Sequence, residues 1–303
     1  MQRYVFFLIF LQFFQAFFSQ TIQNGEQRLF ISDFCCTFAQ KYIAMLQSLI
    51  KIVVEASRLM LTDDFSISQK DGAANIVTSS DIAVQDFLCQ QLNKLLPNSG
   101  FLCEEEDIHD LKHEYLWIID PIDGTANYSR GIRECAICVG LWHSGAMEIA
   151  AVYLPRTDEL FTAERGKGAF LQHPKTGQAS QRIHVSQRPF ENAVLCTALP
   201  VYHKEYAPEC SRIILQAFQQ CNDIRRFGAA APELCYLAMG RCELYFEYLL
   251  SPWDFAAASL ILTEAGGVLC DREGQPVDFT SPSGVIAANN TENLCRLASI
   301  VRG

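Results

Sequence analysis

Trp117-Ile118-Ile119-Asp120-Pro121-Ile122-Asp123-Gly124-Thr125-Ala126-Asn127-Tyr128 is the stretch on which the fold and the chemistry of this chain depend. Residues 116–119 are apolar, and such a run predicts a buried strand. We expect the strand to end at Asp120, because Pro121 has no backbone N–H to donate to a neighbouring strand. Asp120 and Asp123 then lie three residues apart in a tight turn.

Gly124 and Thr125 follow these two acids, where the turning chain can present backbone N–H groups to a ligand. Carboxylate oxygens bind hard cations such as Mg²⁺, and exposed backbone N–H groups bind anions. The combination suits a divalent cation that holds a phosphate group.

The hexapeptide at 120–125 resembles the D-P-I-D-G-T signature of the inositol monophosphatase family, the Mg²⁺-dependent, lithium-sensitive sugar phosphatases. Two further sequence motifs of the family follow in the family's order, Pro-Trp-Asp-Phe-Ala-Ala at 252–257 and Glu-Ala-Gly-Gly at 264–267. The resemblance spans about residues 42–303. It implies the family's fold, a layered αβαβα sandwich of the inositol monophosphatase/fructose-1,6-bisphosphatase type.

Apolar periodicity also predicts a layered, mixed α/β (α+β) protein, with a helix-rich start, an antiparallel middle and an alternating end. Helices are expected at 44–61, 83–96, 208–221, 229–239, 253–265 and 292–301. Further strands are expected at 135–142, 147–154, 160–163, 169–172, 193–197, 223–226, 242–246, 268–270 and 285–288.

Two polar segments, 70–81 and 173–190, are expected to be loops, and the second gives the best internal boundary. We therefore divide the chain into a hydrophobic extension (1–28), an N-terminal metal-binding α+β half (29–185) and a C-terminal α/β half (186–303).

Length and charge restrict the class of partner. The chain has 303 residues, 50% of them hydrophobic, and a formal net charge of −10, so it can bury a sizeable core. Excess negative charge disfavours nucleic-acid binding, and no nucleic-acid partner is expected. It also repels phosphate esters unless cations intervene, which agrees with a metal-dependent reaction on a small phosphate monoester.

The cysteines and the N-terminus bear on localisation. The 13 cysteines are an odd, scattered set, which favours a reducing compartment and a cytoplasmic protein. Residues 5–18 are mostly apolar, but about fourteen residues are fewer than the ~20 that a membrane-spanning helix needs. They fit a secretion signal, an amphipathic anchor or an upstream extension from a misassigned start, and the cysteines favour the last. No other membrane contact is expected.

Five residues form the metal-ligand set that the resemblance implies. Glu104, Asp120 and the backbone carbonyl of Ile122 would bind a first Mg²⁺, and Asp120, Asp123 and Asp254 would bind a second. Glu104 would also contact a weaker third ion, so two or three ions are expected. Taken singly, Glu104 fits a solvated charge run, Asp254 a helix first turn, and Asp120 and Asp123 an ordinary turn. Their joint occurrence in the family's order favours the metal site.

The catalytic residues implied by the resemblance are Thr125, Asp81 and Glu104. Asp81 would accept a hydrogen bond from Thr125, which would orient the attacking water. Asp81 also fits the N-cap of the following helix, and both roles are compatible. Lys70, in the preceding loop, either reaches the anions of the site or is solvated.

The substrate contacts fall on two sides of the metals. Gly124 and Thr125 would bind the phosphate together with Asp123 and Asp254, and the resemblance places Gly228, Ala230 and Glu247 on the hydroxyl side of the substrate. Glu247 suits a polyol, because a carboxylate accepts two hydroxyl hydrogen bonds. The competing interpretation of Glu247 is an exposed acid at a strand end.

Four positions depart from the family pattern: Asn75, Cys103, Ala229 and Ala258. Asn75 stands where many members have an acid, which weakens a third-metal network. Cys103 and Ala258 replace glycines, and Ala229 replaces a serine or threonine. None of the four removes a predicted metal ligand.

The sequence therefore predicts a Mg²⁺-dependent phosphomonoesterase that hydrolyses inositol monophosphate or a similar polyol phosphate, as a homodimer. Fructose-1,6-bisphosphatase, histidinol-phosphatase and nucleotide 3′-phosphatase activities share these motifs. A non-catalytic regulatory protein on the same fold is an alternative of another class, and a membrane-tethered scaffold would depend on residues 5–18 alone.

Overall fold

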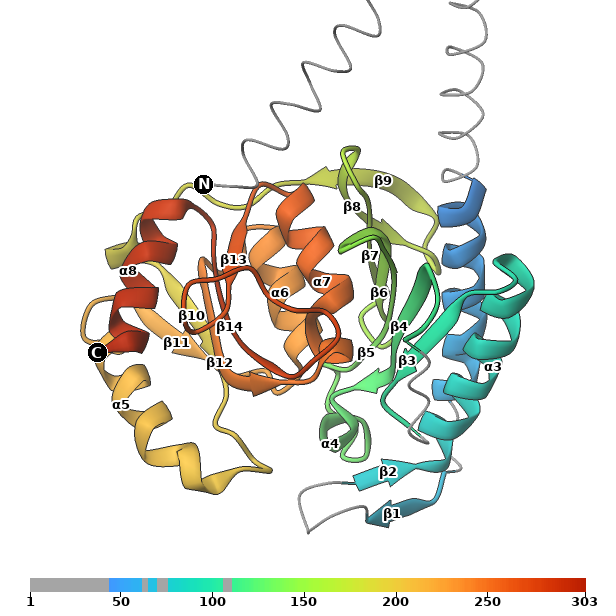
Figure 1. Ribbon diagram of the computed structural model, residues 1–303, viewed down its shortest axis with the longest axis horizontal. Helices are drawn as coiled ribbons and strands as arrows, with labels where there is room; N and C mark the ends of the chain where they lie inside the picture. The colour runs from blue at the N-terminus through green and yellow to red at the C-terminus, as the bar shows by residue number, and fades with distance from the viewer. Residues whose placement is uncertain (1–43, 62–64, 70–75, 106–110) are drawn as a thin grey trace, which may run out of the picture. The chain divides into compact units, whose positions relative to one another are not determined.

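The computed structural model describes residues 44–61, 65–69, 76–105 and 111–303. The chain divides into two units, Met1–Met45 and Leu46–Gly303, and the second contains every labelled helix and strand (Figure 1). Within the described ranges, no helix has the length and apolarity that crossing a membrane requires. The predicted N-terminal extension, Lys70 and Asn75 lie outside the described residues.

A seven-stranded sheet carries the central motif. Its order is β3-β4-β5-β6-β7-β8-β9, and every pair is antiparallel except β3 and β4, which are parallel. The strands are β3 (Gly100–Cys103), β4 (Tyr115–Asp123), β5 (Ala136–His143), β6 (Ala146–Leu154), β7 (Glu159–Glu164), β8 (Gly168–His173) and β9 (Gln178–Ile183).

A five-stranded sheet has the order β11-β10-β12-β14-β13. In it, β10 pairs in parallel with β11 and β12, whereas β14 is antiparallel to β12 and β13. The strands are β10 (Val194–Thr197), β11 (Asp223–Arg225), β12 (Leu244–Leu250), β13 (Val268–Cys270) and β14 (Ser283–Ala288). A separate hairpin pairs β1 (Ile67–Gln69) with β2 (Ile76–Thr78).

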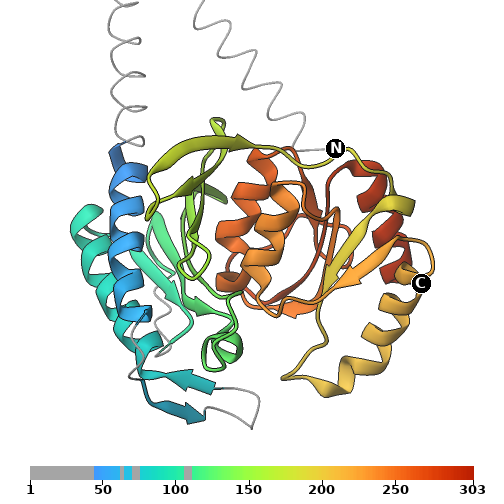
Figure 2. The ribbon, with the colours of Figure 1, turned by 180° about the vertical axis from the view of Figure 1, so that it is seen from behind.

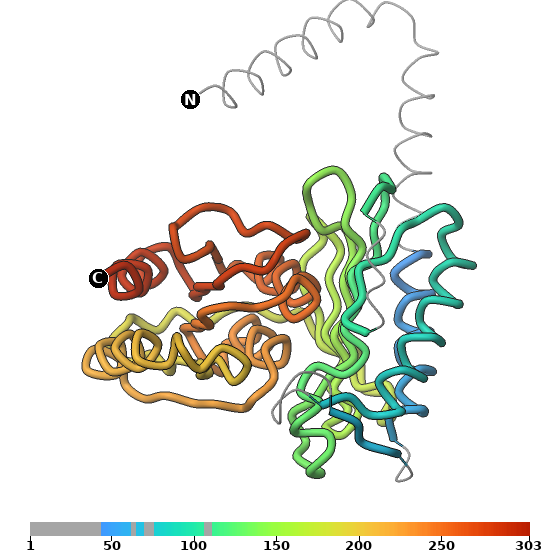
Figure 3. Tube along the Cα trace, turned by 60° about the horizontal axis from the view of Figure 1, so that its bottom comes forward, coloured from blue at the N-terminus to red at the C-terminus, as the bar shows by residue number. Residues whose placement is uncertain are grey.

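Helices separate and cover the two sheets, so that the second unit has five layers (Figures 2 and 3). The helical residues 46–60 and α3 (Ser79–Leu95) cover one sheet, and α5 (Ala207–Phe218) and α8 (Thr291–Arg302) cover the other. Between the sheets lie α6 (Ala230–Ala238) and α7 (Pro252–Glu264), which are buried almost all round. A helix packed on both sides has no polar face to present, and its sequence is apolar accordingly. The αβαβα prediction is confirmed.

The sequence prediction was wrong at the start of α3. The supposed loop at 70–81 contains, in its described part, strand β2 and the first residues of α3, which begins at Ser79 instead of residue 83. Thr78 is the N-cap of α3, and Asp81 occupies the third helical position of a capping box. A short polar strand followed by a capping box lacks the apolar periodicity on which the prediction relied.

Two strand boundaries also differ from the prediction. Strand β4 continues past Pro121 to Asp123, with a register shift where Asp120 faces Cys138 and Asp123 faces Ala136. Strand β9 lies within the supposed loop at 173–190 and is exposed along most of its length, which is why apolar alternation does not reveal it. The division of the chain at residue 185 stays a prediction.

Candidate active site

The site is built around the irregular end of β4. Asp120 is 1% exposed, and its Oδ1 accepts the backbone N–H of Ile122 at 2.9 Å. Gly124 follows with φ +85°, a conformation that favours glycine. A Cβ there would lie 3.0 Å from both the Ala229 Cβ and the Glu134 carbonyl oxygen, so the side chain of any other residue would collide. The motif needs glycine at this position to turn against the segment before α6.

Hydrogen bonds fasten this turn to the beginning of α6. The Asp123 carboxylate accepts the backbone N–H groups of Ala231 at 2.6 Å and of Ala230 at 3.3 Å. The Asn127 amide, in the short helix α4 (Thr125–Tyr128), donates to the carbonyl oxygens of Glu134 and Phe227, both at 2.7 Å. Two segments about a hundred residues apart in sequence thereby form one rigid junction.

Glu104 reaches the same place because β3 and β4 are parallel neighbours, and parallel strands end at the same edge of a sheet. The Glu104 N–H donates to the Ile119 carbonyl oxygen at 3.2 Å, and the charge of its carboxyl group adds to burial in raising the pKa of Asp120, so the two acids lie within electrostatic reach of each other. Gln85 of α3 holds the next residue: its amide bonds the N–H and the C=O of Glu105 at 3.0 and 2.8 Å. Gln85 was not among the residues predicted from the sequence. A polar glutamine on the apolar face of a predicted helix is the feature that could have indicated it.

Asp254 lies in the first turn of α7. The Ser251 N–H donates to Asp254 Oδ2 at 2.7 Å, so this carboxylate completes a capping box and still faces the other acids. The helix-cap interpretation and the metal-site interpretation of Asp254 therefore describe the same side chain. Ile122, whose carbonyl is the fifth predicted ligand, is fully buried in the same turn, directly before Asp123.

The acids raise one another's pKa. Burial, followed by the charges of Glu104, Asp123 and Asp254, raises the pKa of Asp120 well above its ordinary value. Burial raises the pKa of Asp123 to about 7, although two backbone N–H groups oppose the shift. Asp254 has a pKa raised well above the ordinary value by burial and by the charge of Asp123. Such mutual destabilisation of negative charge is the environment in which a cation binds.

The donor set fits Mg²⁺. All the candidate ligands are carboxylate or carbonyl oxygens, the ligands this ion prefers. Among the residues that the structure describes, no lysine or arginine forms an ion pair with Asp120, Asp123 or Asp254. Within the described ranges, no lysine or arginine balances their negative charge, a setting that suits bound cations.

Asp81 and Thr125 meet beside the acids, as the sequence analysis expected. The Thr125 hydroxyl lies 3.0 Å from Asp81 Oδ1 and 3.0 Å from the Ile122 carbonyl oxygen. Asp81 Oδ2 accepts the Thr78 backbone N–H at 2.8 Å and the Thr78 hydroxyl. The expectation that Asp81 itself is the N-cap was wrong, because Thr78 holds that position. Each oxygen of Asp81 has its own task, one in the helix cap and one at Thr125.

Of the predicted substrate residues, Gly228 and Ala230 lie at the junction beside Asn127 and Asp123, and Glu247 lies in β12. Gly228 has φ +84°, and a Cβ there would approach Asn127 Oδ1 to 3.3 Å. The N–H of Gly228 donates to Glu233 Oε1 at 2.9 Å, a buried acid that the sequence analysis missed. Ala230 is buried at the first position of α6.

Glu247 is half-buried within β12, not at a strand end, and accepts the Tyr245 hydroxyl at 3.0 Å. Burial and the charge of Glu233 raise the pKa of Glu247 to about 8. The charge of Glu247 in turn raises the pKa of Asp123 and Asp254, which places it within electrostatic reach of both.

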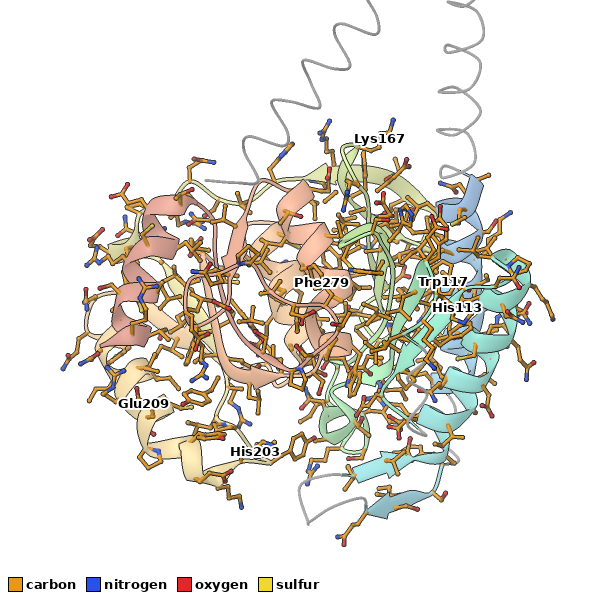
Figure 4. All side chains as sticks on the ribbon, in the orientation of Figure 1. His113, Trp117, Lys167, His203, Glu209 and Phe279 are labelled. Atoms are coloured by element: carbon orange, nitrogen blue, oxygen red, sulfur yellow. The ribbon has the colours of Figure 1, made fainter. Side chains whose placement is uncertain are left out.

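Tyr202 is a further residue that the sequence analysis did not single out. It lies between β10 and α5, next to His203, which Figure 4 labels together with Trp117 of β4. Its side chain is 62% exposed, yet desolvation of the hydroxyl and the charges of Glu104 and Asp254 raise its pKa to about 12. Tyr206 anchors this segment by stacking on Tyr248 with ring centroids 4.8 Å apart.

Three of the four departures from the family pattern lie in the described chain. Ala229 and Ala258 are buried, and both pack without displacing a site residue: Ala229 fills the space beside Gly124. Cys103 is fully buried, and its sulfur lies 3.7 Å from that of Cys89.

Comparison with known proteins gives concordant results. A sequence model of the inositol monophosphatase family matches residues 39–302. A protein of Vibrio cholerae named Nus factor SuhB is 36% identical over 236 residues, which are 77% of this chain and 85% of that protein. The crystal structure of extragenic suppressor protein SuhB from Bartonella henselae matches with a TM-score of 0.77 and 31% identity, over 86% of this chain and 98% of that one. An IMPase structure from Thermotoga maritima matches with a TM-score of 0.74 and 27% identity, over 85% and 96%.

Proposed function

The chain belongs to the inositol monophosphatase family, and from this premise we propose that it is a Mg²⁺-dependent phosphomonoesterase acting on inositol monophosphate or a similar polyol phosphate. The observation that carries the proposal is the convergence of Glu104, Asp120, Asp123 and Asp254 from three separate parts of the chain. Buried acids that raise one another's pKa destabilise the fold, and a bound cation that balances their charge removes this cost.

Glu104, Asp120, Asp123, Asp254 and the Ile122 carbonyl would hold two Mg²⁺ ions, and Glu104 offers a contact for a third. When bound, the ions would polarise the phosphate oxygens and make the attacking water more acidic. The backbone N–H groups of Gly124 and Thr125 begin α4, where a helix has no acceptors of its own, and would donate to the phosphate.

Thr125 and Asp81 would prepare the water for attack. Because the Thr125 hydroxyl donates its hydrogen bond to Asp81 Oδ1, the lone pairs of Thr125 Oγ1 are free to accept a hydrogen bond from the water and orient it. Glu104 would accept the proton that this water loses as its oxygen attacks phosphorus, while the P–O bond to the alcohol breaks and the leaving oxygen takes a proton from solvent. No cysteine, serine or histidine nucleophile is needed in this scheme.

Glu247 would determine the preference for polyol phosphates without taking part in bond breaking. The Tyr245 hydroxyl donates to one oxygen of Glu247 at 3.0 Å. The charge of Glu247 adds to burial in raising the pKa of Asp254, which would lie on the side where the alcohol leaves. Assayed above pH 8, where Glu247 is ionised, Glu247→Gln should lower kcat/KM for inositol monophosphate by roughly 10- to 150-fold, since a lost hydrogen bond to a charged acceptor is worth about 1.5–3 kcal/mol.

The control for Glu247 is p-nitrophenyl phosphate, which has no hydroxyl groups to bind. Its kcat/KM should change less than about twofold in the same variant. An equal loss on both substrates would mean that Glu247 supports the metal site. No loss on either would remove it from substrate recognition.

The function is tested by phosphate release from a panel of phosphomonoesters with full-length protein. The panel contains inositol 1-phosphate, fructose 1,6-bisphosphate, histidinol phosphate, a nucleoside 3′-phosphate and p-nitrophenyl phosphate. Activity should require Mg²⁺, disappear with excess EDTA and fall with Li⁺, with inositol 1-phosphate preferred. Preference for another member would replace the inositol assignment, and metal-independent hydrolysis would overturn the mechanism.

A regulatory role is the second candidate, because curated relatives such as the Vibrio cholerae protein bear the name Nus factor. The complete acid set and the Thr125–Asp81 hydrogen bond favour catalysis, since a purely regulatory protein has no need of either. If the full-length protein binds Mg²⁺ but releases phosphate from no ester of the panel, the regulatory role takes precedence.

A further inference from the structure

Two thiols lie in contact at the base of the acid cluster. The sulfur atoms of Cys89, on α3, and Cys103, the last residue of β3, are 3.7 Å apart. A disulfide bond is about 2.05 Å long, so the sulfurs would have to approach by roughly 1.6 Å to form one. Cys103 also stands where the family pattern has glycine.

We propose that Cys89 and Cys103 form a disulfide when the protein meets a peroxide, and that the bond lowers Mg²⁺ binding by displacing Glu104. The consequence for activity rests on the function proposed above. The disulfide itself does not.

The different exposure of the two thiols gives the order of the steps. Cys89 is half-buried whereas Cys103 is fully buried, so peroxide reaches Cys89 first. The Cys89 sulfur attacks the peroxide, the O–O bond breaks, and a sulfenic acid and one water form. The Cys103 sulfur then attacks the Cys89 sulfur, and the hydroxyl leaves as a second water. Together two thiols and one hydrogen peroxide give one disulfide and two waters.

The position of Cys103 links the bond to the site. Cys103 directly precedes Glu104, and Gln85 of α3 holds both backbone groups of Glu105. If Cys103 is drawn toward α3 while Glu105 stays fixed, the strain falls on Glu104 between them and would rotate it. Strand β3 is the edge of its sheet and, among the strands that the structure describes, pairs with β4 alone, so within the sheet its end is held from the β4 side. The carboxyl group of Glu104, whose charge acts on Asp120, would be carried away from it.

A second thiol pair provides an internal comparison. Cys196 of β10 raises the pKa of the Cys242 thiol, so the two lie close together, but they are 0% and 2% exposed. Because neither sulfur is open to solvent, peroxide should leave this pair reduced at concentrations that oxidise Cys89.

The experiment treats reduced, full-length protein with increasing hydrogen peroxide, and maps disulfides by mass spectrometry of unreduced peptides. Mg²⁺ binding by calorimetry and phosphate release are measured on the same samples, before and after dithiothreitol. The variants are Cys89→Ser and Cys103→Ser, and the matched control is Cys295→Ser, which removes an exposed cysteine on α8.

We expect a Cys89–Cys103 link in wild type and Cys295→Ser, with Mg²⁺ affinity about tenfold or more lower and recovery by dithiothreitol. Cys89→Ser and Cys103→Ser should keep their affinity under peroxide. Absence of the link, or a link that leaves Mg²⁺ affinity unchanged, overturns the inference. A protein that forms the link and loses Mg²⁺ but never released phosphate refutes the phosphatase function alone.

Discussion

Asp120→Asn should lower kcat by about three orders of magnitude or more at saturating Mg²⁺, while the protein stays folded. Asp120 is the one carboxylate that the proposed scheme shares between both ions, and it lies at the centre of the cluster with Glu104, Asp123 and Asp254 around it. Loss of its charge would weaken both ions at once. The transition state would then lose several kcal/mol of charge stabilisation.

The fold should tolerate this change, because asparagine has the size of aspartate and can still accept the Ile122 N–H. Removing a buried negative charge from among three others also removes repulsion. In EDTA, the melting temperature of Asp120→Asn should therefore equal or exceed that of wild type. Asp86→Asn, the same substitution on the exposed face of α3, is the control and should leave kcat unchanged. Near wild-type turnover of Asp120→Asn would exclude Asp120 from the reaction.

Thr125→Ala should lower kcat by roughly 30- to 1,000-fold, equivalent to about 2–4 kcal/mol, with a much smaller change in KM. The hydroxyl of Thr125 is proposed to orient water only as the reaction proceeds, whereas its backbone N–H, which binds phosphate, survives in alanine. Steady-state kinetics with inositol 1-phosphate separate the two constants.

Thr125→Ser is the matched variant, because it keeps the hydroxyl that donates to Asp81. It should retain turnover within about tenfold of wild type. A double-mutant cycle with Asp81→Asn should show that the two losses are not additive, as expected of groups joined by one hydrogen bond. A rise in KM alone for Thr125→Ala would assign Thr125 to binding and not to water orientation.

The arrangement of the site could be predicted where a short sequence motif contains the residues concerned. Asp120 and Asp123 share one turn with Gly124, and the left-handed backbone of Gly124 follows directly from the turn chemistry. Glu104 is different, because it reaches Asp120 through the parallel pairing of β3 with β4. Residue types alone do not specify that pairing; the resemblance to a known family supplied it.

The supporting residues escaped prediction for a physical reason. Gln85 and Glu233 act on backbone groups that are close only in the folded chain, and a single polar residue in an apolar run does not reveal its partner. Strand β9 is an exposed edge strand, so it lacks the apolar alternation of its neighbours. Tyr202 is far in sequence from every acid that affects its pKa.

The raised pKa values of the acids predict the direction in which Mg²⁺ affinity changes with pH. Burial raises the pKa of Asp123 from 3.8 to about 7, so the folded, metal-free protein holds more protons than the unfolded chain between these values. Without Mg²⁺, this group makes the protein less stable as pH rises through that range. Because Mg²⁺ binds the ionised form, its affinity should increase over the same range and binding should release protons.

The most direct test is therefore isothermal titration of full-length protein with Mg²⁺ at pH 6.5, in buffers of different ionisation enthalpy. We predict two or more Mg²⁺ per chain, release of about one proton or more on binding, and tighter binding at pH 8. Asp120→Asn should lose most of this binding, while Asp86→Asn should keep it. Two results would contradict a metal site at the end of β4. One is Mg²⁺ binding that releases no protons and has the same affinity in Asp120→Asn as in wild type; the other is no Mg²⁺ binding at all.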